Sequence, residues 1–385
     1  MSPITPRRDE ASGVLPTLQQ EPHPKPIELV TDQLEIPSLD DWQYLLLVHD
    51  PETDKASAAL DVNVGNFSDE DTMPGMAHAV EHLLFMGTKK YPEENAYNPS
   101  NDEAPSETNL SPLYGGLDRF AQFFIEPLFL PSTLDRELRA SDQWRLHQLE
   151  KSLSNPKHPY CHFSTGNLEV LKTAPEAQGV DVRQKFIDFY EKHYSANRMK
   201  LCVLGRESLD VLEGWAANLF SGIPNKHLPQ NRWEGEVPFN KDHLAMQSFA
   251  KPVIDSRELN LVFTFLDEEN LYESQPSRYI SHLIGHEGPG SIMAYIKSKG
   301  WANSLSAAAH THISLLHQTS PQEWIFNELR EMAEIEFKFM QKMPASRFTI
   351  KISSVMQGPL PTEWLLSGKS LSRDYPGDWD QKEKW

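Results

Sequence analysis

The chain has 385 residues, a formal net charge of −19 at pH 7 and only 39% hydrophobic residues. Its length favours two or three domains, and its acidity argues against nucleic acid as a partner, because phosphate binding needs clustered Lys and Arg side chains. Two cysteines cannot form a disulfide scaffold, and no apolar run approaches the roughly 18 residues of a membrane helix, so we expect a cytoplasmic protein that does not contact a membrane.

Strands and helices are expected to alternate in the first half of the chain. Residues 1–40 contain many prolines with little periodicity and are expected to be disordered. Residues 57–64 alternate apolar and polar side chains, which is the pattern of a half-buried strand. Leu117, Phe120 and Phe124 share one face at helical spacing, which predicts an amphipathic helix. The expected elements are strands at 44–48, 57–64 and 199–204, and helices from Pro74 to Met86, from Gly116, and over 134–153, 180–194 and 208–220.

The second half is expected to repeat this rhythm after a linker. Residues 222–240 are rich in proline and asparagine, which is typical of a connecting segment. Trp324 and Phe326 lie in the last expected helix, and we expect both to pack in the core. The expected elements are strands at 245–250 and 259–265 and helices at 276–285, 291–298 and 322–340. The two halves together predict an α+β fold.

The sharpest motif is His78-Ala-Val-Glu81-His82, an H-x-x-E-H pattern. Residues four apart on a helix share one face, with Cβ atoms about 5–6 Å apart, so both imidazoles can reach one zinc ion at about 2.0–2.1 Å. Glu81 lies beside His82, where its carboxylate can reach a zinc-bound water and act as the general base. The spacing therefore predicts a zinc site for peptide hydrolysis. The plain alternative is two surface histidines and a solvated glutamate on an amphipathic helix, because zinc also needs a third protein ligand.

Other chemically active residues carry weaker signals. His282 and His286 are also four residues apart and lie next to Glu287, and we interpret them as a helix end rather than a second metal site. Cys161 and Cys202 are expected to be buried small apolar residues rather than nucleophiles.

The sequence around the motif resembles the insulinase family of inverted zinc metalloproteases. The similar segments are Met73–Tyr97, Leu117–Phe129, Trp144–Lys151, Asn155–Pro159, Val203–Leu209, His282–Ser291 and Gly300–Trp301. The resemblance covers about residues 38–385 and implies two insulinase-family domains, each a mixed β-sheet flanked by helices. It also implies that His78 and His82 bind Zn²⁺ and that Glu81 is the catalytic base. The implied organisation is a disordered segment at 1–40, a catalytic zinc domain at 41–221, a linker at 222–240, an incomplete second domain at 241–371 and a tail at 372–385.

The chain departs from the family pattern in two places near the motif. In the family the third zinc ligand is a glutamate in a stretch of about ten residues, nearly three helical turns, that this chain lacks between Ala140 and Ser141. Glu137 maps to a neighbouring acidic position and could substitute only if the helix shifts. After Tyr97, residues 98–109 contain two prolines, which disfavour the edge strand that pairs with substrate in relatives.

The resemblance implies a zinc metalloendopeptidase that cleaves short peptides such as pheromones. The alternative, from a different class, is a catalytically impaired relative that binds peptides or proteins without cleaving them. In the family a second half closes the substrate chamber, and this chain ends before it. We therefore expect an uncovered apolar face, with self-association or a partner chain covering the open half-chamber.

Overall fold

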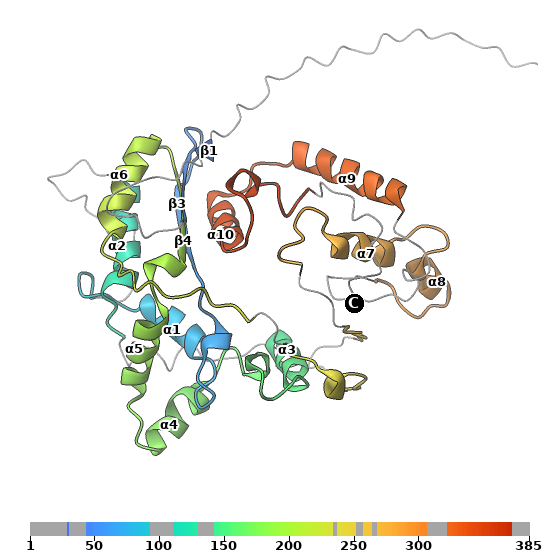
Figure 1. Ribbon diagram of the computed structural model, residues 1–385, viewed down its shortest axis with the longest axis horizontal. Coiled ribbons are helices and arrows are strands. Elements are labelled where there is room, and N and C mark those ends of the chain that lie inside the picture. The colour runs from blue at the N-terminus through green and yellow to red at the C-terminus, as the bar shows by residue number, and fades with distance from the viewer. Residues whose placement is uncertain are drawn as a thin grey trace, which may run out of the picture.

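The computed structural model describes residues 29–30, 44–92, 111–129, 142–233, 237–251, 257–263, 268–305 and 322–371 (Figure 1). In these residues one mixed sheet lies between a group of helices from the first half and a helix from the end of the chain (Figure 1). The α+β class predicted from the sequence is confirmed.

The strands and helices of the first half follow the predicted order closely. The strands are β1 (Leu29–Val30), β2 (Tyr44–His49), β3 (Ser57–Val62) and β4 (Met199–Gly205). The α-helices of the described residues are α1 (Met76–Leu84), α2 (Pro112–Ile125), α3 (Asp142–Ser152), α4 (Ala174–Ala177), α5 (Val182–His193), α6 (Leu209–Phe220), α7 (Pro276–Gly285), α8 (Ile292–Ser298), α9 (Glu323–Lys338) and α10 (Ala345–Val355). None of the helices within those ranges combines the length and the apolar character needed to cross a membrane.

The sheet has the strand order β1-β2-β4-β3. β2 and β4 are parallel, with Leu46 opposite Cys202, whereas β3 is antiparallel to β4 and places Ala59 opposite the same cysteine. β1 pairs antiparallel with β2. Its two residues lie within the segment 1–40 that was expected to be disordered, so this short edge strand was missed.

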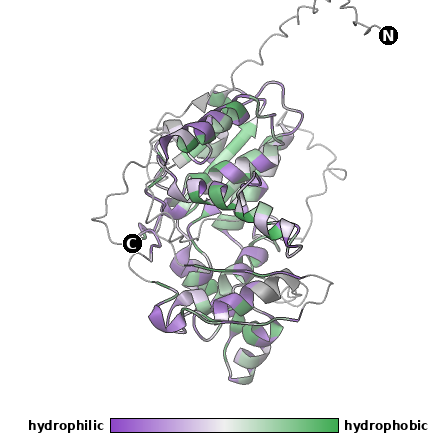
Figure 2. Ribbon diagram, turned by 90° about the vertical axis from the view of Figure 1, so that its right-hand side faces the viewer, coloured by the Kyte–Doolittle hydropathy of each residue, from purple (hydrophilic) through white to green (hydrophobic). Residues whose placement is uncertain are grey.

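Alternate side chains of the central strands enter two different cores, because successive residues of a strand point to opposite faces. Leu47, Leu201 and Val203 belong to the core shared with α1, α2, α5 and α6. Leu46 and Cys202 belong to a second core, which α10 covers. Figure 2 shows a strand of the sheet coloured as hydrophobic among helices of mixed hydropathy. The prediction of a buried small residue is confirmed for Cys202 and wrong for Cys161, which is half-buried.

Helix α10 lies far along the chain yet covers the sheet built by the first half (Figure 1). Ile352 packs in the second core with 1% of its surface exposed. The hydroxyls of Ser57 and Thr349 lie 2.9 Å apart, and the Gln357 side chain donates to the Arg198 carbonyl at 3.2 Å. Residues predicted to belong to separate domains are therefore joined through one face of the sheet.

The two strands predicted for the second half are wrong for the residues described. Residues 245–251 and 257–263 have irregular backbone. Phe249 is 85% exposed and Leu259 is 83% exposed. An apolar segment becomes a stable strand only when it gains partner strands and a buried face, and these segments gain neither in the described structure. The helices predicted for this half are confirmed as α7, α8 and α9.

Helix α9 shows why one core prediction fails. Phe326 is 3% exposed and packs in the interior as expected, whereas Trp324 is 64% exposed. Residues two apart on an α-helix point to opposite sides, so one apolar interface cannot bury both. The prediction that Trp324 packs in the core is therefore wrong.

Candidate functional site

Helix α1 carries the predicted motif at the edge of the core that it shares with α2, α5 and α6. The face that packs inward consists of Met76, Ala77, Ala79, Val80, Leu83 and Leu84. On the rest of the helix His78 and His82 are half-buried and Glu81 is exposed. Since the apolar residues anchor one side of the helix at the 3.6-residue period, all three motif side chains remain outside the packed interface.

The structure brings the two predicted metal ligands together. The Nε2 atoms of His78 and His82 are 3.1 Å apart, and the ring planes meet at 82°. His78 Nδ1 lies 3.1 Å from the carbonyl oxygen of Thr165. A carbonyl only accepts hydrogen bonds, so Nδ1 carries the proton and the lone pair of Nε2 is available toward His82. Both Nε2 atoms can thus lie about 2.0–2.1 Å from one zinc ion, and Thr165 orients His78 as an outer-shell partner does.

Glu81 is exposed, and its negative charge affects the pKa of two nearby side chains, the buried Tyr194 and the half-buried Asp61. Burial raises the pKa of the Tyr194 hydroxyl, and the negative charge of Glu81 adds to that effect. Burial also raises the pKa of Asp61, which a hydrogen bond from Gln357 opposes and the charge of Glu81 reinforces. Glu81 therefore combines access to water with a position one residue from His82, which suits a proton acceptor in hydrolysis.

Two glycines allow the loop that carries Thr165 to touch the beginning of α1. Gly75 precedes the helix with φ of +96°, and a Cβ there would lie 2.3 Å from the backbone nitrogen of Gly166. Gly166 also has a positive φ, and a Cβ there would lie 2.9 Å from the Pro74 carbonyl oxygen. Glycine adopts this backbone region without steric penalty. The Gly75–Gly166 contact therefore sets how closely Thr165 approaches His78.

A buried acid and a buried base flank this contact. Asp69 accepts hydrogen bonds from the backbone N–H of Gly75 and of Ala77, both at 2.7 Å. Burial raises the pKa of Asp69 to about 6, and these two hydrogen bonds oppose the rise. Lys151 is 2% exposed and donates to the hydroxyl of Ser164. Burial lowers the pKa of Lys151, and the charge of Asp69 opposes that change.

These supporting residues were not identified from the sequence. Asp69 and Thr165 are separated from His78 by nine and 87 positions, and only the folded chain brings them together. The single local signal is an aspartate placed a few residues before the Pro74-Gly75 pair at the beginning of a helix, since aspartate commonly caps helices.

The described residues do not supply a third metal ligand. They contain no cluster of three His, Cys, Asp or Glu side chains able to hold a metal ion. Glu137, the weak substitute suggested by the sequence, lies outside the described ranges. In the second histidine pair, the ring centroids of His282 and His286 are 5.6 Å apart, and this pair also lacks a third possible ligand among the described residues. In the part of the chain that the structure describes, the metal-binding potential of the motif therefore rests on two histidines.

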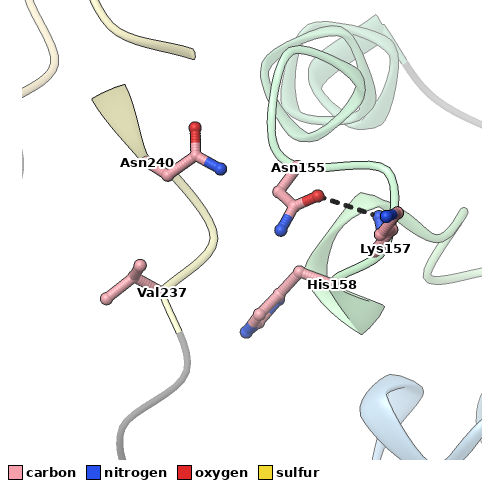
Figure 3. Close-up of a pocket in the computed structure, with 5 residues that line it drawn as sticks. All are labelled: Asn155, Lys157, His158, Val237 and Asn240. Atoms are coloured by element: carbon pink, nitrogen blue, oxygen red, sulfur yellow. Dashed lines mark hydrogen bonds between the residues drawn. The ribbon is translucent and has the colours of Figure 1, made fainter. Parts of the chain in front are cut away.

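A separate hollow of about 200 Å³ lies between the loop after α3 and the chain near residue 240 (Figure 3). None of the motif residues lines it. Lys157 donates its backbone N–H to the Asn155 side chain at 3.1 Å, and His158 Nδ1 accepts from the Tyr160 backbone at 3.0 Å. These groups serve local turns, so the α1 motif remains the better candidate site. The lining residues are Asn155, Lys157, His158, Val237 and Asn240.

Comparison with known proteins extends this result. The chain is 39% identical over 388 residues to the A-factor-processing enzyme of Saccharomyces cerevisiae, covering 86% of this chain and 38% of that protein. It is 38% identical over 390 residues to the insulin-degrading enzyme of Homo sapiens, covering 87% of this chain and 38% of that protein. The crystal structure of pitrilysin matches with a TM-score of 0.72 and 25% identity, over 87% of this chain and 41% of that chain. The chain thus spans about two fifths of the length of the curated relatives it matches.

Two family profiles match separate parts of the chain. Residues 181–336 match the family described as Peptidase M16 inactive domain. Residues 44–109, which include α1 and its motif, match the family described as Insulinase (Peptidase family M16). These matches and the similarity to named proteases agree with the resemblance found in the sequence, and the chain belongs to the insulinase family, peptidase family M16.

Proposed function

We propose that this chain is a zinc-dependent metalloendopeptidase of short peptides. The observation that carries this proposal is the 3.1 Å separation of the two Nε2 atoms on a helix that also exposes Glu81. The names of the A-factor-processing enzyme and the insulin-degrading enzyme support peptide processing. We also propose the cytoplasm as the site of action, because a low cysteine content fits a reducing compartment.

Each residue of the motif has a distinct role in this proposal. His78 and His82 would hold zinc through Nε2, and Thr165 keeps the His78 ring in the required orientation. Zinc, when bound, supplies a Lewis acid that polarises the scissile peptide carbonyl. The Glu81 carboxylate takes a proton from the attacking water and passes it to the leaving amine.

A second candidate function is peptide binding without cleavage. It is favoured by the absence of a third ligand from the described residues, because catalytic zinc is usually held by three protein groups. A site with two protein ligands would bind zinc more weakly than the family site does. The two candidates therefore differ in zinc retention and in turnover.

Zinc binding and peptide cleavage by the full chain test the proposal. We expect zinc to bind and to be removed by a mild chelator, since water would replace the third protein ligand that the described residues lack. His78→Ala should weaken zinc binding at least about tenfold. His282→Ala, which makes the same change in the other histidine pair, should leave zinc binding unchanged.

Each outcome separates the candidates. Cleavage of a fluorogenic peptide that His78→Ala abolishes supports the metalloendopeptidase. Zinc binding without cleavage supports the binding protein. Equal zinc affinity in wild type and His78→Ala would contradict the assignment of the metal ligands.

We also propose that the chain associates with a second copy of itself. Trp324 and Ile335 are 64% and 58% exposed on one face of α9, and Phe339, which directly follows the helix, is 72% exposed. Large exposed apolar patches on soluble proteins commonly mark interaction surfaces. Light scattering should show a concentration-dependent dimer that Trp324→Ser together with Phe339→Ser weakens. A wild-type chain that stays monomeric at high concentration would count against self-association.

A further inference from the structure

Asp69 holds the beginning of the motif helix from outside that helix. Its carboxylate is buried, with 8% of the residue exposed. One oxygen accepts from Gly75 N–H and the other from Ala77 N–H, both at 2.7 Å. Ala77 directly precedes His78, so this carboxylate fixes the backbone turn from which the first predicted zinc ligand projects.

A second anchor fixes the partner of His78 on the opposite side. The buried Lys151 donates to the Ser164 hydroxyl. Ser164 directly precedes Thr165, whose carbonyl oxygen lies 3.1 Å from His78 Nδ1. The opposite charges of Lys151 and Asp69 act on one another across this region. The carboxylate therefore secures the helix, while the ammonium secures the loop that orients the ring.

We propose that Asp69 is a positioning residue for the His78–His82 pair, because it holds the first turn of α1 in register with the loop that carries Thr165. This inference rests on the proposed zinc site and adds a residue that the motif does not include. The helix cap of α5 is a purely structural cap in this protein, and it makes only one hydrogen bond. Asp181 caps α5 through one hydrogen bond to Gln184 N–H at 3.0 Å and is exposed. Asp69 is buried, and each of its two carboxylate oxygens accepts a hydrogen bond from the same turn of α1. Two hydrogen bonds to one turn restrict the orientation of that turn more than a single capping bond does.

The substitution Asp69→Asn separates positioning from capping. Asparagine keeps the shape of the side chain but offers one acceptor oxygen, so Gly75 N–H and Ala77 N–H cannot both be satisfied. Asp181→Asn is the matched control, because it removes the same charge at the N-cap of α5, where one acceptor oxygen is sufficient. Both variants are compared with the wild-type full chain by amide hydrogen exchange without metal and by zinc competition with a chelator.

We expect Asp69→Asn to speed exchange of the α1 amides about tenfold or more and to weaken zinc binding about 10- to 100-fold, the range seen for loss of outer-shell partners. Asp181→Asn should leave exchange in α1 and α5 and zinc binding nearly unchanged, because asparagine caps a helix about as well as aspartate does. Asp69→Glu keeps both acceptor oxygens and should recover part of the zinc affinity. If Asp69→Asn does not fold, the comparison of Asp69→Glu with wild type replaces it, with a smaller loss of zinc affinity expected.

Two results would overturn the inference. The first is an Asp69→Asn chain with wild-type exchange in α1 and wild-type zinc affinity. The second is an equal loss of zinc affinity in Asp69→Asn and Asp181→Asn, which would show a general effect of losing one negative charge. If the wild-type chain binds no zinc, the proposed function fails, while hydrogen exchange in α1 still decides whether Asp69 holds that helix.

Discussion

Gly75→Ala should lower the free energy of unfolding by about 3 kcal/mol or more, which places it among the severe single substitutions. The new Cβ would lie 2.3 Å from the backbone nitrogen of Gly166 and 2.4 Å from its Cα, so the loop must move. The positive φ adds about 1–2 kcal/mol of its own. Movement of the loop carries Thr165 away from His78, so zinc affinity should also fall about 10- to 100-fold. Urea unfolding and zinc competition measure the two effects.

Gly179→Ala provides the control for this prediction. Gly179 has a similar positive φ of +78°, but a Cβ there meets no atom within 4 Å. We expect only the backbone penalty of about 1–2 kcal/mol and no change in zinc affinity. Equal losses of stability and of zinc affinity in the two variants would show that the Gly75–Gly166 contact does not position the site.

Periodicity predicted the elements that carry a regular pattern and a full set of partners. In β3, Ala58, Leu60 and Val62 on one face alternate with the residues of the other face, whereas every residue of β4 is buried. Both strands form where expected. α10 was missed, although Phe348, Ile352 and Val355 follow Pro344 at helical spacing, because Ser, Thr, Ile and Val, which have low helix propensity, make up most of it. β1 was missed since two residues in a proline-rich segment give no period to read.

The same reasoning explains the two wrong strands. Residues 245–250 and 259–265 are apolar enough to suggest strands, but a strand depends on hydrogen bonds to another segment. The local sequence pattern does not show whether such a partner segment is present. The described parts of both segments expose large apolar side chains such as Phe249 and Leu261, at 85% and 70%, which is the state of a candidate strand without a sheet.

In the candidate site too, the local contacts could be predicted from the sequence, whereas the tertiary contacts could not. The spacing of His78 and His82 on one helix is local, so the sequence was sufficient to predict that the two rings meet. The contact of His78 with Thr165 and the double hydrogen bond of Asp69 depend on tertiary approach. Their position relative to the motif is set by the Gly75–Gly166 contact, and no periodicity in the sequence encodes that contact.

Glu81→Gln should abolish any peptidase activity while leaving zinc binding nearly unchanged. Glutamine has almost the same shape but cannot accept the proton of the attacking water, and loss of a general base typically lowers turnover by about 100- to 10,000-fold. Zinc should stay bound because the rings of His78 and His82, with Nε2 atoms 3.1 Å apart, provide the metal contacts. Peptide cleavage and zinc content are measured on the same preparation.

Two controls make this test specific to the motif. Glu176→Gln removes the charge of another exposed helical glutamate, on α4, and should change neither activity nor zinc. His82→Ala should lose zinc and activity together. A Glu81→Gln chain that loses zinc would make Glu81 a ligand rather than the base. One that keeps full activity would mean that another group accepts the proton, because a glutamine amide has no basic site at neutral pH.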